Sequence, residues 1–282
     1  MEYNKLSGNS AKFDGTAIEP ILVSIRPVMR CNFSCKFCLS NSDSSRKEEA
    51  KELELDKFFE QLDKANFNGT LHICGGEPFL YKNIDNLMVK CDQHAPEVAV
   101  LTNGSWIPFI YNDQTFLRLK ERLERVKQLT NVMIRISIDS YHMDGEAGNP
   151  KSFERLKLFV KAADEIGLIP GKHYSVQVTE RTDNEAIAMG NRIAMELGTT
   201  KGPLFIRTRS LYRLGRAKNE TVGRRFSLGE GGYIAVGPTL SGNLIIYAGR
   251  LEETKDIVYG TIDKLSEVIE NHRRIIASEL RG

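Results

Sequence analysis

The chain has 282 residues, with 39 basic and 37 acidic side chains and a formal charge of +2. This length fits one large domain, or one domain with a small appendage. The balanced charge excludes a global basic field for nucleic acid and an acidic tail. The sequence has no apolar run of the roughly 18 residues that a membrane-spanning helix needs, and residues 1–20 lack the apolar core of a signal peptide, so we expect a cytoplasmic protein.

Short β-rich segments alternate with longer amphipathic segments after a polar arm over residues 1–20. The expected strands are Ile21–Arg26, Thr70–Ile73, Val98–Thr102, Val132–Asp139, His173–Thr179 and Leu204–Arg209. The expected helices are Leu55–Ala65, Ile84–His94, Thr115–Leu129, Phe153–Ile166 and Glu185–Leu197. This alternation is typical of parallel βα units and predicts an α/β fold. Residues 21–210 are expected to form a partial (β/α)6 TIM-like barrel, with an open sheet as the alternative.

The pattern changes after Arg209, and residues 211–282 are predicted to form a small C-terminal hairpin-plus-helix extension. Tyr233–Val236 and Leu244–Tyr247 flank turn residues that include Gly242, which indicates a β-hairpin. A final helix is expected over Ile262–Leu280.

The predicted strands carry apolar side chains on one face and polar side chains on the other. In Val132–Asp139, for example, branched residues alternate with Arg135, Ser137 and Asp139. Helices suit the apolar face, so the polar face is expected to line a shared, wet interior that holds a ligand. A packed barrel would instead fill this interior with apolar residues. The alternative is an exposed sheet face, which is unusual for a parallel sheet. The interior candidates for substrate contact are His72, Arg135, Gln177, Arg207 and Arg209.

Three of the five cysteines fall within eight residues, directly after the first expected strand, where residues 30–39 read RCNFSCKFCL. Thiolates of Cys31, Cys35 and Cys38 suit an iron–sulfur cluster in which one iron lacks a protein ligand. A structural zinc site normally has four ligands, and no fourth Cys or His precedes His72. Cys74 and Cys91 are interpreted as packing residues.

The Cys-x3-Cys-x2-Cys spacing, with Phe37 before the third cysteine, resembles the signature of the radical S-adenosylmethionine (radical SAM) superfamily. Further matches follow in that family's order at the ends of successive strands. They are Gly75-Gly76-Glu77-Pro78, Thr102-Asn103-Gly104 and Ser137-Ile138-Asp139-Ser140. The resemblance covers roughly residues 20–210.

The resemblance implies one 4Fe–4S cluster on Cys31, Cys35 and Cys38, with SAM bound beside it. It implies that Phe37, Gly75, Gly76, Glu77, Thr102, Asn103, Ser137, Asp139 and Lys151 bind this cofactor. Glu77 would receive the methionine ammonium group, and Lys151 would pair with the SAM carboxylate. Reductive cleavage of SAM would then give a 5′-deoxyadenosyl radical that removes hydrogen from a substrate.

The region after residue 210 resembles a shortened SPASM/twitch domain, but it contains no cysteine, so a single cluster is expected. Tyr141 and His142 follow the fourth strand and are catalytic candidates for proton transfer. A structural or surface role is the alternative for these residues, for Lys151 and for the arginines of the sixth strand.

The predicted function is hydrogen abstraction from a small, anionic or strongly polar substrate such as a sugar, aminosugar or nucleoside. The outcome would be dehydrogenation, dehydration, decarboxylation or epimerisation. An external one-electron reductant such as a flavodoxin or ferredoxin is implied, with no membrane or nucleic-acid partner. One alternative is a maturase that modifies a ribosomal peptide, and another is a non-catalytic iron–sulfur electron-transfer or sensor protein. A pure electron carrier normally keeps all irons ligated, which disfavours the last alternative.

Overall fold

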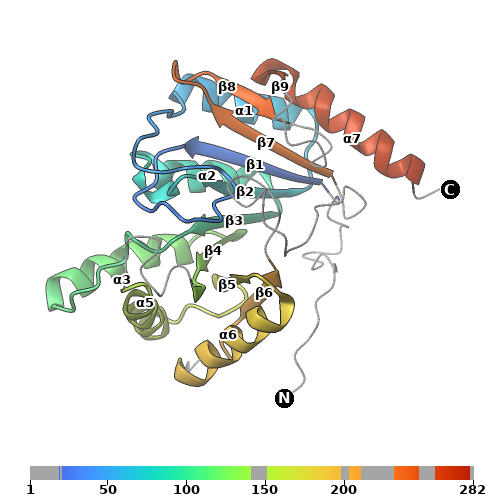
Figure 1. Ribbon diagram of the computed structural model, residues 1–282. Coiled ribbons are helices and arrows are strands. Elements are labelled where there is room, and N and C mark those ends of the chain that lie inside the picture. The colour runs from blue at the N-terminus through green and yellow to red at the C-terminus, as the bar shows by residue number, and fades with distance from the viewer. Residues whose placement is uncertain are drawn as a thin grey trace.

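A nine-stranded sheet forms the centre of the molecule (Figure 1). The computed structural model describes residues 19, 21–140, 151–197, 203–210, 232–247 and 258–279. The strand order is β6-β5-β4-β3-β2-β1-β7-β8-β9, and β1 to β6 are parallel neighbours in sequence order. These strands are β1 Ile21–Val28, β2 Thr70–Gly75, β3 Glu97–Thr102, β4 Val132–Ser137, β5 Tyr174–Glu180 and β6 Ile206–Ser210.

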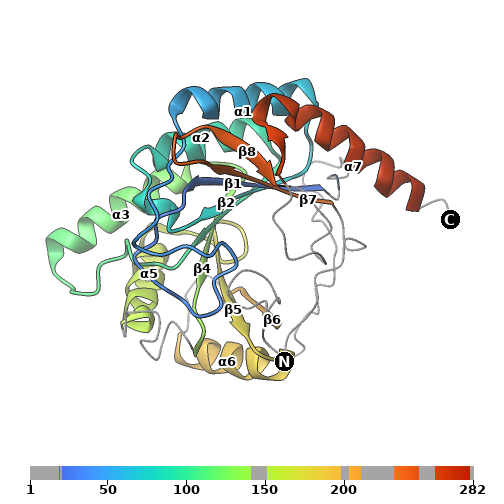
Figure 2. The same ribbon diagram turned by 45° about the horizontal axis from the view of Figure 1, so that its top comes forward.

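Helices cover the outer face of the parallel strands, as Figure 2 shows. They are α1 Glu52–Lys64, α2 Ile84–His94, α3 Asp113–Lys127, α5 Ser152–Ile166 and α6 Asp183–Glu196, with a 3₁₀ turn at Pro78–Leu80. Capping boxes begin two of them, because Asn112 and Thr182 exchange hydrogen bonds with the third residue of α3 and α6. These local signals explain why helix boundaries lie within a few residues of those predicted from sequence.

The core lies between the helices and one face of the sheet. Ile134, Ile136 and Val176 are at most 3% exposed and pack in the same cluster as Leu156 and Phe159 of α5. Burying one such side chain contributes about 1.5–3 kcal/mol relative to leaving it exposed. The predicted separation of an apolar, helix-facing set from a polar set is therefore present in the sheet.

The C-terminal segment continues the same sheet. β7 Gly232–Pro238 runs parallel to β1, and β8 Leu244–Tyr247 returns antiparallel to β7 as the predicted hairpin. β9 Val258–Thr261 follows β8, where the sequence analysis expected only the entry to a helix. A 3₁₀ turn at Ile262–Lys264 then leads into α7 Leu265–Glu279.

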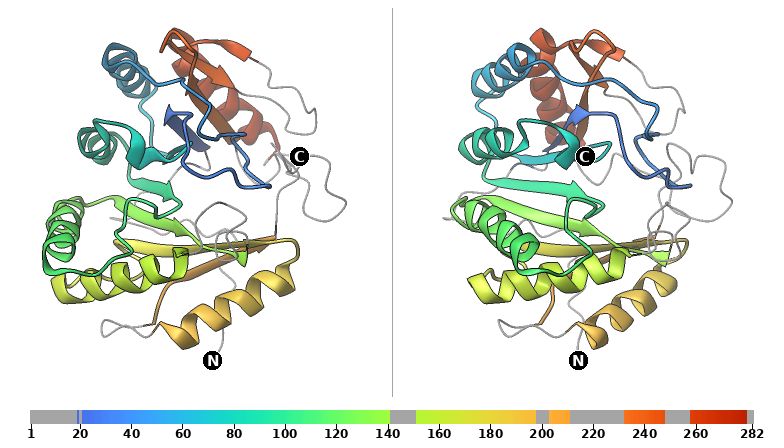
Figure 3. Two further views of the ribbon diagram at one scale, coloured as in Figure 1. Left: turned by 60° about the vertical axis from the view of Figure 1, so that its left-hand side comes forward. Right: turned by 90° about the vertical axis from the view of Figure 1, so that its left-hand side faces the viewer.

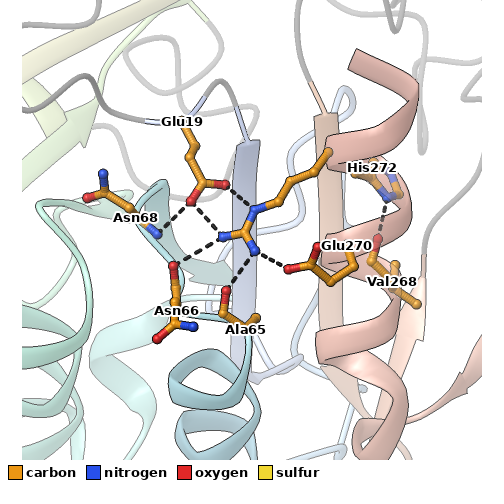
Figure 4. Close-up of polar contacts among 8 residues, drawn as sticks. Glu19, Ala65, Asn66, Asn68, Val268, Glu270 and His272 are labelled. Atoms are coloured by element: carbon orange, nitrogen blue, oxygen red, sulfur yellow. Dashed lines mark hydrogen bonds and ion pairs between the residues drawn. The ribbon is translucent and has the colours of Figure 1, made fainter. Parts of the chain in front are cut away.

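One arginine connects α7 to the start of the parallel sheet (Figure 4). Arg273 donates from Nε and Nη2 to the Glu19 carboxylate at 2.8 and 2.6 Å. It also donates to the carbonyl oxygens of Ala65 and Asn66 at the end of α1, and it pairs with Glu270. Three segments that are distant in sequence are thus joined by one guanidinium, whose fork of donors suits this arrangement.

The sheet is curved but not closed (Figure 3). In the described ranges, β6 pairs only with β5 and β9 only with β8, so the two edges do not meet. The predicted partial barrel with a hairpin-plus-helix extension is confirmed. No helix in the described part of the chain is long and apolar enough to cross a membrane.

Candidate cluster and cofactor site

The three clustered cysteines lie on the loop that follows β1. Cys31 is buried, while Cys35 and Cys38 are half-buried. Cys31 N–H donates to the Asp43 carbonyl at 2.9 Å, which fixes where the loop begins. Backbone N–H groups point at two of the sulfurs, because Phe33 N lies 3.4 Å from Cys31 Sγ and Ser42 N lies 3.3 Å from Cys38 Sγ. Such N–H···S contacts favour thiolates, so the donor set fits an iron–sulfur cluster.

The surroundings of Cys31 disfavour a free thiolate. Burial raises the pKa of the Cys31 thiol to about 12, against the hydrogen bond from Phe33 that lowers it. Glu77, Cys35 and Cys38 lie close enough to raise it further by charge repulsion. A bound iron centre reverses this preference, because a coordinating thiol loses its proton outright. The environment therefore suits a metal ligand better than a free nucleophile.

The glycine motif packs against the backbone that leads into this loop. A Cβ on Gly76 would lie 2.0 Å from the Arg30 carbonyl oxygen, and one on Gly75 would lie 2.6 Å from that of Val28. Gly75 also has φ +109°, which side chains rarely adopt. Gly76 N–H donates to Val28 O at 2.8 Å, and Glu77 N–H donates to Arg30 O at 3.0 Å. Glycine is required here for close approach of two chain segments, and the expected contact of Gly75 and Gly76 with SAM remains a prediction.

The Glu77 side chain connects the carboxyl end of β2 to that of β3. Its side chain is 1% exposed. One carboxylate oxygen accepts from Thr102 Oγ1 at 2.7 Å and from Phe79 N–H at 3.1 Å. The other accepts from Asn103 N–H at 2.8 Å. The predicted contact with a methionine ammonium group remains a prediction, but the carboxylate already positions the turn after β3.

That turn reaches the cysteine loop through its side chains. Asn103 Nδ2 lies 3.6 Å from Cys31 Sγ and 3.1 Å from Asn32 Oδ1. Ser105 Oγ donates to the same Asn32 oxygen at 3.1 Å. Thr102 is 2% exposed, and its hydroxyl also accepts from Gly104 N–H at 3.0 Å. The Thr-Asn-Gly sequence therefore connects the glycine motif to the cysteine loop.

Aromatic and basic side chains reinforce the same region. Phe79 and Trp106 stack with ring centroids 4.3 Å apart and planes 18° apart. Arg155 of α5 donates to the Ser105 carbonyl at 2.6 Å and to the Ile107 carbonyl. Sequence reasoning missed Arg155, whose only signal is a charged residue on the buried face of a helix.

The strand register places the predicted interior residues in rows on the face away from the helices. Arg135 is opposite Ser175, and Ser137 and Arg207 lie on either side of Gln177. His72 lies between Ser24 and Ala99, one row nearer the start of the sheet. Arg209 of β6 is opposite Thr179 of β5. His72, Arg135, Gln177 and Arg207 therefore lie on the polar face, and contact of all five candidates with substrate remains a prediction.

Within these rows, burial falls from β4 to β6. Arg135 is 5% exposed and Gln177 is 6% exposed, whereas Arg207 is exposed. Gln177 Nε2 donates to the Arg207 carbonyl at 3.2 Å, so it fixes the position of β6. The Ser175 hydroxyl is fully buried and has no hydrogen-bond partner among the described residues.

The remaining cofactor candidates lie on separate segments of the chain. Asp139 is 5% exposed and follows the strand, while Phe37 is 8% exposed on the cysteine loop. Lys151 is exposed, with its ammonium group 4.4 Å from the centroid of the Phe109 ring. Tyr141 and His142 lie outside the described residues.

A second buried carboxylate near Asp139 was also missed from sequence. Glu180 accepts from Ser140 N and Oγ, both at 2.7 Å. Burial raises the pKa of Glu180, and the nearby Asp139 adds to this effect. An acidic residue at the end of a buried strand is the signal that points to it.

Residues 25–193 match the family model described as the Radical SAM superfamily. A GTP 3′,8-cyclase of Helicobacter pylori is 29% identical over 131 residues, which cover 45% of this chain and 36% of that protein. The subtilosin biosynthesis protein AlbA of Bacillus subtilis is 27% identical over 155 residues, covering 53% of this chain and 32% of that protein. The chain spans between about a third and just over half the length of the curated relatives it matches. Among solved structures, BtrN in complex with AdoMet and 2-DOIA has 14% identity and a TM-score of 0.47, covering 93% of this chain and 85% of that chain.

Proposed function

Because the chain belongs to the radical SAM superfamily, we propose that it is an enzyme that removes hydrogen from a small, polar, anionic substrate. Family membership confirms the predicted cofactors, a 4Fe–4S cluster and SAM. When bound, these two groups supply reductive cleavage of SAM to a 5′-deoxyadenosyl radical.

The protein's own residues hold and position these groups. Cys31, Cys35 and Cys38 would supply three thiolates from one loop to hold the cluster. The glycine motif and Glu77 fix that loop against the ends of β2 and β3. This arrangement supports a cofactor site at the ends of the parallel strands, where α/β barrels bind their ligands.

The observation that carries the substrate class is the polar face of β4, β5 and β6. Arg135 and Arg207 lie on this face, and a guanidinium fork suits a carboxylate or phosphate. The relatives named GTP 3′,8-cyclase support a nucleotide-like substrate as one member of this class.

A second candidate function is modification of a ribosomal peptide. The similarity to the subtilosin biosynthesis protein AlbA favours it. A peptide would contact this face through its backbone and side chains, so the two functions differ in the substrate and not in the cofactors.

Transfer of deuterium from the substrate distinguishes the two candidate functions. Anaerobically reconstituted protein is incubated with SAM, a reductant and deuterated candidates, namely nucleotides and sugars in one set and peptides in the other. Deuterium in 5′-deoxyadenosine, measured by mass spectrometry, identifies the substrate class. Transfer from peptides alone contradicts the small-molecule proposal, and absence of any 5′-deoxyadenosine contradicts both.

We retain the proposed division into an arm over residues 1–20, a radical SAM partial barrel over 21–210 and a C-terminal extension over 211–282. A cytoplasmic location stays part of the proposal, because an odd number of cysteines argues against a disulfide framework. An external one-electron donor such as a flavodoxin or ferredoxin is the expected partner, and Tyr141 and His142 remain the candidates for proton transfer.

A further inference from the structure

The side chain of Asn103 is held in one orientation. Its backbone N–H donates to the buried Glu77 carboxylate at 2.8 Å. Its amide oxygen accepts from Ser105 N–H at 2.9 Å, which places the NH2 group on the opposite side. That group lies 3.1 Å from Asn32 Oδ1 and 3.6 Å from Cys31 Sγ. An NH2 group has two hydrogens, so it serves both acceptors at once.

A fixed donor beside a cluster ligand has an electrostatic consequence. Reducing an iron–sulfur cluster adds one negative charge, which is shared with the thiolate sulfurs. A hydrogen bond to a sulfur is therefore stronger in the reduced state, and such bonds are one of the factors that set the reduction potential. The donors to Cys31 from Phe33 and to Cys38 from Ser42 are backbone groups. Asn103 supplies a donor that substitution can remove.

We propose that Asn103 is a positioning residue for the iron–sulfur cluster, whose side-chain amide donates a hydrogen bond to Cys31 Sγ and raises the cluster's reduction potential. This role differs from the SAM contact expected from the sequence. It rests on the cluster assignment within the proposed function, and it is independent of the substrate.

Glu77 extends the same network by one step. Its carboxylate holds the Asn103 backbone and the Thr102 hydroxyl, so it fixes the position from which the amide reaches the sulfur. The glycine motif and the Thr-Asn-Gly turn would together control the reduction potential of the cluster as well as the position of SAM.

The test is a redox titration of reconstituted protein without SAM or substrate, monitored by electron paramagnetic resonance. Asn103→Ala removes the donor and is expected to lower the ratio of reduced to oxidised cluster at a fixed potential by roughly fivefold. Asn103→Asp keeps the size but places an acceptor at the sulfur, so a larger decrease is expected. Ser105→Ala is the matched control, because it removes a bond to Asn32 from the same turn without touching a sulfur.

Potentials are compared only between samples with the same iron content. An unchanged potential in both Asn103 variants overturns the proposal, and so does an equal shift in Ser105→Ala. If both Asn103 variants lose iron, a measurement on the wild-type protein tests the proposal instead. With ¹⁵N in the side-chain amide of asparagine, the reduced cluster should show a nitrogen coupling in pulsed resonance spectra, and its absence overturns the proposal. Failure of the wild type to take up any cluster contradicts the proposed function itself, which keeps the two failures distinct.

Discussion

The half of the sheet formed by β1 to β3 and the half formed by β4 to β6 use polar residues differently. In the first half, polar groups bond to one another between loops. Glu77 accepts three hydrogen bonds, and Gly76 contacts the backbone of Arg30. In the second half, polar side chains lie in rows along the strands, and Arg207 at the end of the row is exposed.

This difference separates two tasks. A cofactor site must hold reacting groups in one geometry, which requires supports that are themselves fixed. A substrate face needs accessible donors, and its side chains gain their partners from the ligand. Substitutions in the first half should therefore damage the cluster or the fold, while substitution of an exposed polar residue in the second half, such as Arg207, should affect turnover.

The largest effect is expected for Cys35→Ala. The cysteine loop has no spare thiolate, so iron content and SAM cleavage should both be lost, as measured by iron analysis and 5′-deoxyadenosine formation. Cys91→Ala is the control, because Cys91 is fully buried on α2 and burial raises its pKa. Full 5′-deoxyadenosine formation by Cys35→Ala would contradict the cluster assignment.

Gly76→Ala should nearly abolish cluster uptake. The new Cβ would lie 2.0 Å from the Arg30 carbonyl oxygen, so the backbone before Cys31 must move. Gly167→Ala is the matched control: it costs about 1–2 kcal/mol for a left-handed residue, but its Cβ would make only an ordinary contact, 4.0 Å from Lys127 Nζ, at the end of α5. Normal iron content in Gly76→Ala would show that this contact is not required.

Glu77→Ala should lower the free energy of unfolding of the apoprotein by roughly 3 kcal/mol, because three donors lose a buried carboxylate. Glu77→Gln retains one oxygen for Thr102 and Phe79 but turns an NH2 donor toward Asn103 N–H, so about half that decrease is expected. Denaturant unfolding measures both. Wild-type stability of the Ala variant would mean that the carboxylate has no structural role and is available to a ligand.

The strands and motifs were predictable because their signals are local. Alternation over six to eight residues determines which face of β4 is polar, and the cysteine spacing alone indicates the cluster. Partners between loops were not predictable. Nothing in the sequence says that Gly76 meets Arg30, or that Arg155 reaches the Ser105 carbonyl, since each pairing depends on how separate loops pack together. The same reason explains why β9 was missed: its pairing with β8 decides its structure.

On the substrate face, Arg207→Ala should reduce substrate-dependent turnover by about ten- to a hundredfold, the size of one charge-assisted hydrogen bond. Substrate-free SAM cleavage should be unchanged, because the cofactor residues lie on other strands. Arg192→Ala provides the control, since Arg192 lies on α6 and pairs with Glu196. Equal loss of both activities would place Arg207 in the cofactor site, and no loss would leave it on the surface.

The smallest effect concerns pH and the start of β5. His173 is 6% exposed, and its Nδ1 accepts from Ile169 N–H at 2.9 Å, so its neutral form is required. Burial lowers the pKa of His173, and the charges of Lys172 and Lys127 lower it further. The unfolded chain therefore binds this proton more readily, and stability falls as pH drops below the ordinary histidine pKa of about 6.5. We expect the unfolding midpoint of the wild type to decrease more between pH 8 and pH 5 than that of His173→Gln, in which this titration is absent. Equal decreases in the two proteins would show that the pH dependence of stability arises from groups other than His173.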